Sequence, residues 1–443
     1  MPALYSHTTR ADFTILTAAI YNADHLNHIT NGVPAQLDDY STNTGQMQTQ
    51  TDPGEVGSES LATSLAGEIE RLRYALREAK GVSNWYESAK FTLGDVPGNH
   101  ILYNTGLEIF QEGTSFTNPV SGTYIADGWQ ATKVTSGTLD WSQDTSVVPT
   151  PAQVGAFVRA SLKALVTATD VSIAATDFLH VMQPIEGYDI HPIAQRIFTL
   201  SFWVRSSVTG TFCVAARNLG ADRSCVLEYT INVANTWEYK SLTFPASPSA
   251  GTWNYTNDVG IYLGFTLMAG TNFHTTPGAW NTGSFIATSN QVNWIGTASA
   301  TFYLTAVKIT PGPGASQWIA HPMGKEISRC ERYFEKTYDI GVTPGTVTNF
   351  GRIVVYMDGL TSALHSASKE IQFRVRKGKT TPTITFYSPA TGTSGKVRDA
   401  VNAADLNNGA PNSGDASYTS THTTTIAATS LNIQWHHTIN ARL

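Results

Sequence analysis

The stretch FTLSFWVRSS at residues 198–207 decides the fold class. Bulky apolar side chains occupy every second position from Phe198 to Val204, and Thr, Ser, Trp and Arg occupy the positions between them. A period of two places one set of side chains in a core and the other set on the opposite face of a strand. The stretch therefore predicts a half-buried strand of an antiparallel sheet.

The same pattern recurs on both sides of this stretch. Further apolar segments, separated by the turn signals Gly, Asn, Asp and Pro, cover residues 210–218, 224–233, 259–270 and 300–310. Short strands at this spacing are typical of an antiparallel β-sandwich or jelly roll. We therefore expect a central β-sandwich over residues 99–312, which ends in a run of alternating Pro and Gly.

The composition agrees with a mainly β protein of several domains. The chain has 443 residues, which corresponds to roughly three domains at about 150 residues each. Charged residues make up 14%, against about 25% in an average soluble domain, while the chain carries 10 Trp, 18 Tyr and 18 Phe. The net charge is -6 and no basic stripe is present, so we expect no nucleic-acid partner.

The first residues and the cysteines indicate the cellular compartment in which the chain folds. No window approaches the length of about 18 apolar residues that a membrane span needs, and residues 1–10 lack the regions of a signal peptide. We therefore expect no membrane insertion and folding in a cytosol. Cys213, Cys225 and Cys330 form an odd and sparse set, which predicts buried thiols rather than a disulfide framework.

Two segments show helical periodicity. In residues 60–80 the apolar positions recur at spacings typical of a coiled-coil seam, and they are Leu65, Ile69, Leu72 and Leu76. A lone helix of this length is marginal in water, so we expect copies of the chain to bury the seam together. Residues 322–338 show a second helical pattern with Ile327, Cys330 and Phe334 on one face.

These observations predict five regions and a mainly β fold class. Residues 1–57 are polar and irregular, which indicates a segment that becomes ordered on a partner surface. We expect the coiled-coil helix and a linker at 58–98, the β-sandwich at 99–312 and a linker helix at 313–338. Residues 339–443 are expected to form a C-terminal β-rich domain.

Several stretches, in the same order along the chain, resemble appendage proteins of tailed bacteriophages. The N-terminal run at 4–81 resembles the particle-anchoring segment of fibre proteins of short-tailed phages. QPIEGYDI at 183–190 and NTWEYKSLTFP at 235–245, with the strands around them, resemble a carbohydrate-binding jelly-roll module of phage tail proteins. Residues 326–341 resemble the helix that follows this module in those proteins. Residues 373–389 and 433–443 resemble their C-terminal domain.

The resemblance implies a homotrimeric tail fibre of the virion that is assembled in the host cytoplasm. Residues 1–57 would attach it to virion proteins of the tail, adaptor or nozzle, and its β-domains would adsorb to host surface polysaccharide or lipopolysaccharide. Trimerisation would involve Leu65, Ile69, Leu72, Leu76, Ile327 and Phe334. Two alternatives stay open: a tailspike that depolymerises the polysaccharide, and a purely structural fibre on the head or collar.

A sugar-binding site needs a flat apolar surface for the ring and polar groups for its hydroxyls. Trp203 and Arg205 share one face of their predicted strand, and Arg217 and Asn218 end the next strand. The other candidates lie in turn-rich stretches, and they are Trp253, Tyr255, Trp280 and Trp294. The alternative for each aromatic residue is a place in the sandwich core or in a subunit contact.

Hydrolysis of a glycan would need two carboxylates about 5 to 10 Å apart. The pairs Asp140/Asp144 and Glu186/Asp189 are available, but such spacings are common in turns, so no catalytic residue is assigned. The same carboxylates could supply oxygen ligands for a structural Ca²⁺, but no loop has dedicated Ca²⁺ spacing. We therefore expect no enzyme activity, no metal and no cofactor.

A basic run lies between the expected strands of the C-terminal domain, at Arg374, Arg376, Lys377 and Lys379. Contact with an acidic polysaccharide is one interpretation of this run. We favour the other, an edge strand that positive charge protects against unwanted pairing.

Overall fold

The computed structural model describes residues 101–409, 411–424 and 427–443. They belong to one compact unit that extends from residue 94 to residue 443. The predicted virion-anchoring segment lies outside the described residues, as does the predicted coiled-coil seam of Leu65, Ile69, Leu72 and Leu76. Within the described part of the chain, no helix is long and apolar enough to cross a membrane.

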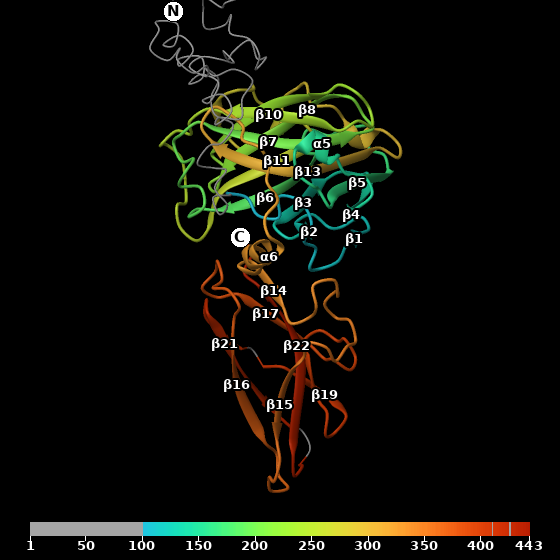
Figure 1. Cartoon of the computed structure of the whole chain (residues 1–443), viewed down its shortest axis with the longest axis vertical. Helices are drawn as coiled ribbons and strands as arrows, with labels where there is room; N and C mark the ends of the chain where they lie inside the picture. Colours follow the sequence, from blue (N-terminus) through green and yellow to red (C-terminus); the bar gives the residue numbers. More distant parts are fainter. Residues whose placement is uncertain (1–100, 410, 425–426) are drawn as a thin grey trace, which may run out of the picture. The chain divides into compact units, whose positions relative to one another are not determined.

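Two antiparallel sheets form the central sandwich (Figure 1). Sheet A has the order β1 (Ser115–Phe116), β4 (Thr138–Asp144), β5 (Ser161–Ala168), β13 (Thr301–Pro311), β7 (Phe198–Ser206) and β10 (Glu238–Phe244). Sheet B has the order β12 (Trp280–Thr282), β9 (Arg223–Ile231), β8 (Gly210–Asn218), β11 (Val259–Ala269), β6 (Phe178–Glu186), β3 (Trp129–Val134) and β2 (Thr123–Ala126). The predicted mainly β fold with a central β-sandwich is confirmed.

The alternation in β7 builds the core between the two sheets, as predicted. Its inward side chains from Phe198 to Val204 are at most 1% exposed and pack in the largest apolar cluster of the described residues. Thr199 and Ser201, on the outward face, are buried as well. The segment that follows β13 covers Thr199, whose Oγ1 donates a hydrogen bond to the Gly312 carbonyl (2.8 Å).

Helical segments within the described residues are short. They are α5 (Pro151–Val154), η5 (Thr271–Phe273), η6 (Trp294–Gly296) and α6 (Met323–Glu331). The three cysteines are all buried free thiols, as expected. Cys213 and Cys225 do not oppose each other in the β8–β9 pair, because their cross-strand partners are Glu228 and Ala216.

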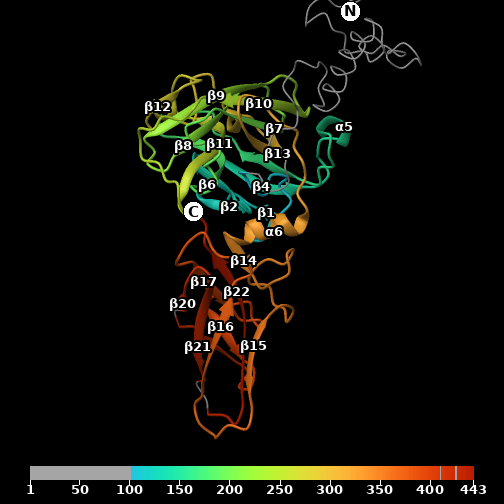
Figure 2. The ribbon, with the colours of Figure 1, turned by 60° about the vertical axis from the view of Figure 1, so that its left-hand side comes forward.

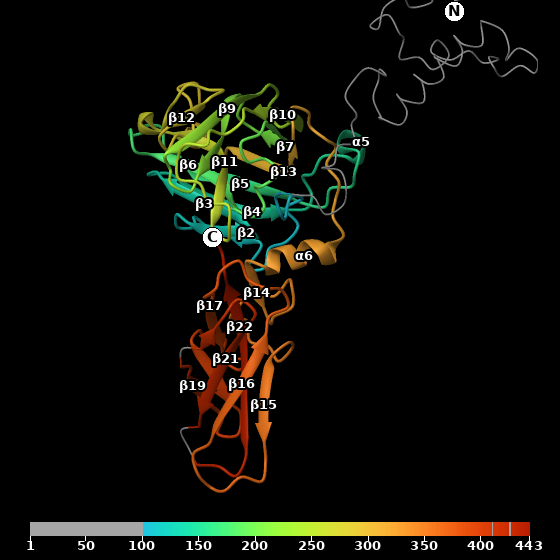
Figure 3. The ribbon, with the colours of Figure 1, turned by 90° about the vertical axis from the view of Figure 1, so that its left-hand side faces the viewer.

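The prediction of one helix over residues 322–338 is wrong for its second part. Helix α6 ends at Glu331, and Phe334–Lys336 forms strand β14 instead (Figure 3). The pairing of β14 with a long strand at the end of the chain overrides the local helical pattern. Phe334 is therefore 3% exposed inside the unit, whereas Ile327 stays on the helix and packs beside Cys330.

The C-terminal region contains two further antiparallel sheets (Figure 2). Sheet C surrounds β22 (Leu431–Asn440) and contains β14, β15 (Ile353–Met357), β17 (Thr383–Tyr387), β18 (Lys396–Asp399) and β19 (Ala404–Asn407). Sheet D contains β16 (Ser366–Gln372), β21 (Ser417–Thr423) and β20 (Asn412–Ser413).

The basic run after β16 lies in a loop, so the expectation of an edge strand is wrong. Carboxylates pair with three of its four cations. Arg374 contacts Glu331 (2.6 Å), Arg376 contacts Asp415 (2.7 Å), and Lys377 contacts Glu335 (2.5 Å). The run therefore helps to hold the C-terminal region to α6 and β14.

A buried ion pair links β6 to the residues that follow α6. Glu186, at the end of β6, accepts hydrogen bonds from Arg332 Nε and from Tyr333 Oη, both at 2.7 Å. The Tyr333 ring stacks on Tyr103, with ring centroids 4.7 Å apart. Gln183 binds the main chain of Tyr103 through two hydrogen bonds. The QPIEG motif therefore holds the chain segments that precede and follow the sandwich.

Histidines are part of the core of the C-terminal region. His437 Nδ1 shares a hydrogen bond with Tyr418 Oη (2.9 Å), and Trp435 Nε1 donates to the same oxygen (3.1 Å). The ring of His422 lies against Trp435, with centroids 4.9 Å apart. Burial lowers the pKa of His422 to about 4 and is the main cause that lowers the pKa of His437 to about 3.

Mild acid is expected to destabilise this core. An unfolded histidine has a pKa near 6.5, so the stability gained by keeping His422 and His437 neutral is complete above about pH 6.5 and is lost as the pH falls below it. Lowering the pH from about 7.5 to about 5 should reduce the free energy of unfolding by about 2 kcal/mol per buried histidine. Thermal unfolding of the wild type and of His422→Phe measures this pH slope. The variant should have the smaller slope, and equal slopes would contradict the prediction.

Candidate functional site

An open cavity of about 210 Å³ lies on the outer face of sheet B. Alternation along β6 directs Leu179 and Val181 into the core, and it therefore directs Phe178, His180 and Met182 outward. The remaining lining residues come from neighbouring strands and loops, and they are Ser121, Thr132, Arg217, Phe273 and Ile286. Side chains that are far apart in the sequence thus meet on one face of the sheet.

Aromatic rings form one wall of the cavity. Phe178 meets Phe273 of η5 edge-to-face, with ring centroids 5.1 Å apart, and it meets His180 in the same manner at 5.7 Å. The cavity therefore presents ring faces and edges beside aliphatic side chains. Such a surface suits the apolar C–H face of a sugar ring.

Arg217 reaches the cavity from the end of β8. Its Nη1 donates a hydrogen bond to Ser284 Oγ (2.9 Å), and its guanidinium lies over the Tyr262 ring (5.7 Å). Burial lowers the pKa of Arg217, but a guanidinium stays charged in proteins. No carboxylate of the described chain forms an ion pair with it.

His180 is neutral and has unused hydrogen-bonding capacity. Burial, and then the positive charge of Arg217, hold the pKa of His180 well below its ordinary value. Neither His180 Nδ1 nor Thr132 Oγ1 has a hydrogen-bond partner in the described chain, although both atoms are buried. Position 264 must be glycine for this ring to fit, because a Cβ there would lie 2.9 Å from Nδ1. The cavity thus combines apolar walls with unpaired polar groups.

Of the eight predicted glycan-binding residues, Arg217 lines the cavity. Asn218 follows it but is fully buried. Its side chain donates to Asp222 and to the Thr252 carbonyl and accepts from the main chain at Asp222 and Arg223. Asn218 therefore shapes the turn between β8 and β9.

Trp203 and Arg205 lie on the outer face of sheet A, on the other side of the sandwich. Trp203 is half-buried, and its ring centroid is 5.6 Å from that of Tyr239. Arg205 lies over the Tyr303 ring at 5.5 Å. These two candidates form an aromatic surface that is separate from the cavity.

The other four aromatic candidates pack on the sandwich core. Trp294 is fully buried. Trp253 and Trp280 meet edge-to-face, with ring centroids 5.4 Å apart, and both pack against the core together with Tyr255. The turn-rich stretches that carry them fold back over the sheets.

Sequence reasoning missed Phe178, His180, Thr132 and Phe273. A signal for two of them exists in FLHVMQPIE at 178–186, because a period of two places Phe178 and His180 on one face of the strand. Phe273 comes from a turn without any periodic pattern, and only the fold brings it to Phe178.

The carboxylates considered for hydrolysis or for Ca²⁺ have structural partners. Glu186 is held by Arg332 and Tyr333. Asp140 accepts a hydrogen bond from the Asn118 N–H (3.0 Å), and Asp144 accepts from the Ser146 and Val147 N–H groups. Burial raises the pKa of Asp189, the fourth carboxylate. In the part of the chain that the structure describes, no three His, Cys, Asp or Glu side chains are grouped for a metal.

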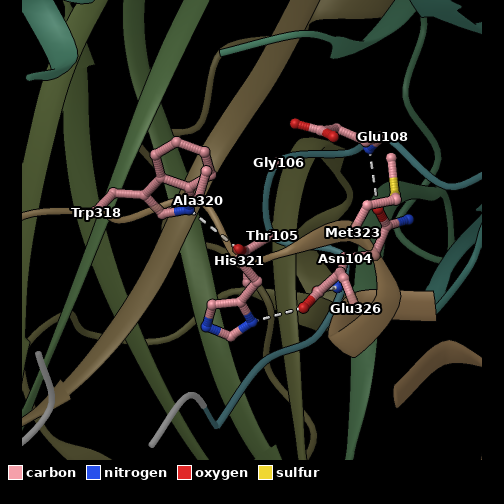
Figure 4. A pocket seen from close by; sticks show the side chains of 9 residues that line it. All are labelled: Asn104, Thr105, Gly106, Glu108, Trp318, Ala320, His321, Met323 and Glu326. Atoms are coloured by element: carbon pink, nitrogen blue, oxygen red, sulfur yellow. Dashed lines mark hydrogen bonds and ion pairs between the residues drawn. The ribbon is translucent and has the colours of Figure 1, made fainter. Parts of the chain in front are cut away.

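A second, small hollow lies beside the start of α6 (Figure 4). Its volume of about 20 Å³ leaves room for about one water molecule. His321 Nδ1 and Glu326 Oε2 are 2.7 Å apart, and Trp318 Nε1 donates to Thr105 Oγ1 (3.0 Å). Its polar groups thus bind one another, and we assign no ligand to it.

No protein-family model and no curated protein matches the chain. Among solved structures, it is similar to the enzymatically active domain of bacteriophage CBA120 tailspike protein 4, at 14% identity, a TM-score of 0.25 and coverage of 48% of this chain and 21% of that chain. It is also similar to a putative sugar binding protein from Bacteroides thetaiotaomicron (10% identity, TM-score 0.27, coverage 48% and 100%). A third similar structure is a family 11 carbohydrate-binding module from Clostridium thermocellum, at 9% identity and a TM-score of 0.25, with coverage of 46% of this chain and 98% of that chain.

The chain spans about a fifth of the tailspike domain and nearly all of the two sugar-related structures. With TM-scores of 0.25 to 0.27, these likenesses carry no weight for function. The functional assignment therefore depends on the residues of the cavity.

Loss of Arg332 is expected to destabilise the unit, because Glu186 would keep a buried charge without a cation. Arg332→Ala should lower the free energy of unfolding by about 3 kcal/mol. Arg376→Ala is the matched control, since its 73% exposed side chain pairs at the surface and should contribute less than about 1 kcal/mol. Chemical denaturation compares the two variants. Equal losses would contradict a structural role for Glu186.

Proposed function

We propose that this chain is a glycan-binding protein and that the cavity on sheet B is its binding site. The observation that carries this proposal is the unpaired polar lining beside an aromatic wall. Thr132 Oγ1 and His180 Nδ1 lack partners in the described chain, and Phe178 and Phe273, which contact each other, line the same cavity. Sugar hydroxyls would satisfy the polar atoms, and the rings would cover the apolar face of the sugar.

The size of the cavity suits one sugar unit of a longer glycan. Its 210 Å³ are many times the ~10–15 Å³ that a single water molecule needs, so a group much larger than water fits. One small site per chain gives weak binding, and several linked copies raise the overall affinity without new contacts. A glycan-binding role therefore favours an oligomer.

The larger role follows from the resemblance of the sequence to phage appendage proteins. The protein is a homotrimeric tail fibre of the virion that adsorbs to host surface polysaccharide or lipopolysaccharide. Residues 1–57 would attach it to other virion proteins, and the predicted coiled-coil helix at 60–80 would join the three chains. These assignments are supported by the sequence pattern of those residues.

Exposed apolar side chains in the C-terminal region support the oligomer. Val354, Tyr356 and Met357 on β15 are all exposed, and Phe350 before this strand is 78% exposed. Large exposed apolar groups on one strand and just before it mark a surface that a partner covers. In the trimer, the partner is a second copy of the chain.

A binding role fits the carboxylates better than a hydrolytic one. Glu186 is 2% exposed and bonded to Arg332, so it cannot act as a free general acid or nucleophile. Asp140 and Asp144 accept main-chain hydrogen bonds from the loops beside them. The protein is therefore proposed to bind a glycan without cutting it.

Removal of an aromatic wall is expected to weaken binding. Phe273→Ala in the full-length chain should reduce glycan affinity at least about tenfold, because one sugar-stacking surface is lost. Phe157→Ala removes a 68% exposed phenylalanine away from the cavity and should leave affinity unchanged. Binding to a glycan array and to lipopolysaccharide from host cells measures the effect. Equal affinity of the two variants would contradict the site, and a wild type that binds no glycan would contradict the function.

The trimer predicts a particle of three times the chain mass of 47.9 kDa. Sedimentation of the full-length chain measures this mass. Val354→Lys places a charge on the exposed face of β15 and should shift the equilibrium toward smaller species. Val120→Lys, at a 77% exposed valine of the sandwich, should leave the mass unchanged. A monomeric wild type would overturn the proposal.

A further inference from the structure

We propose that the cavity on sheet B selects an acidic sugar unit, such as a uronic acid, and binds its carboxylate through Arg217. This inference rests on the proposed glycan-binding function and narrows its ligand class. It follows from three features of the described residues: a cation without a carboxylate, neutral neighbours and free donor groups.

The first feature is the isolation of the Arg217 charge. Two other buried or half-buried arginines have acidic partners, since Arg332 contacts Glu186 at 2.5 Å and Arg442 contacts Glu112 at 2.5 Å, whereas Arg205 on sheet A lies over the Tyr303 ring without a carboxylate partner in the described chain. Arg217 instead contacts Ser284, the Met182 sulfur (3.8 Å) and the Tyr262 ring. A charge in an apolar cavity without a counter-ion is unfavourable, and a ligand carboxylate would supply that counter-ion.

The second feature is the electrostatic character of the other lining residues. His180 is uncharged at neutral pH because burial disfavours its protonated form. The remaining side chains of the lining are aromatic, aliphatic, thioether or hydroxyl groups, so none of them offers a negative charge to Arg217. The cavity therefore carries a net positive charge and disfavours a cationic amino sugar.

The third feature is the geometry of the available donors. A guanidinium has five N–H groups, and the described chain engages two of them, with Ser284 Oγ and with the Met182 sulfur. The other N–H groups can form paired hydrogen bonds with a planar carboxylate. Phe178 and Phe273 then contact the sugar ring, and the Thr132 hydroxyl contacts a ring substituent.

The basic run in the C-terminal loop is a weaker candidate for the same ligand. Arg374, Arg376 and Lys377 all contact carboxylates of the chain, so an acidic sugar would have to displace them. Arg217 has no such competitor. The chemistry of acidic-glycan binding therefore belongs to the sandwich and not to the loop.

The test uses the full-length protein and matched pairs of oligosaccharides. Each pair holds an acidic member (hyaluronan, oligogalacturonate or oligosialic acid) and its carboxyl-reduced form. The wild type should bind an acidic member at least about tenfold more tightly than its reduced form, which corresponds to about 1.4 kcal/mol. Arg217→Gln should lose this preference, and Arg159→Gln, a 61% exposed control, should keep it.

The outcomes separate this inference from the proposed function. Binding of acidic and reduced members with equal affinity would overturn the acidic preference and leave glycan binding intact. Binding of neither class, on these pairs and on the glycan array, would overturn glycan binding itself.

Thermal unfolding of Arg217→Met checks for a merely structural role. Because the substitution removes a charge without a carboxylate partner, the melting temperature should stay the same or rise while the acidic preference disappears. A drop of several degrees would assign Arg217 to the fold and overturn the inference.

Discussion

The alternation of side chains along β6 is the constraint on which the rest of the structure depends. Its inward residues Leu179 and Val181 belong to the sandwich core, and its outward residues Phe178 and His180 line the cavity. A slip of one residue in register would exchange the two sets and place an imidazole in the core. The packing that stabilises the sandwich therefore also fixes the geometry of the proposed binding site.

Much of the fold could be predicted from the sequence, and little of the site. Alternation in 198–207 is a local signal with a direct physical cause, and the structure follows it. A tryptophan in a turn has the same local signal whether the turn lies in solvent or folds over a core. The sequence therefore could not show that Trp294 is fully buried. Arg217 was identified because it ends a recognisable strand, whereas Phe273 reaches the cavity through tertiary packing alone.

The low charge content of the chain has a structural counterpart. Many of the charges near α6 and β14 form ion pairs that hold segments together, including Lys377 with Glu335 and Arg332 with Glu186. The sandwich carries ion pairs as well, including Lys240 with Glu238 and Lys163 with Asp144. In the cavity on sheet B, the Arg217 guanidinium has no carboxylate partner among the described residues and is available to a ligand.

The partners of β6 lie far away along the chain, which has a consequence for how the protein forms. Gln183 binds residue 103, 80 positions earlier, and Glu186 binds residue 332, 146 positions later. Such contacts are reached only after large loops close, so folding is slow and partly formed sheet edges stay exposed meanwhile. During synthesis, β6 acquires its full set of contacts only after residue 332 has left the ribosome. Cellular chaperones would therefore have their largest effect after β6 has left the ribosome and before residue 332 has.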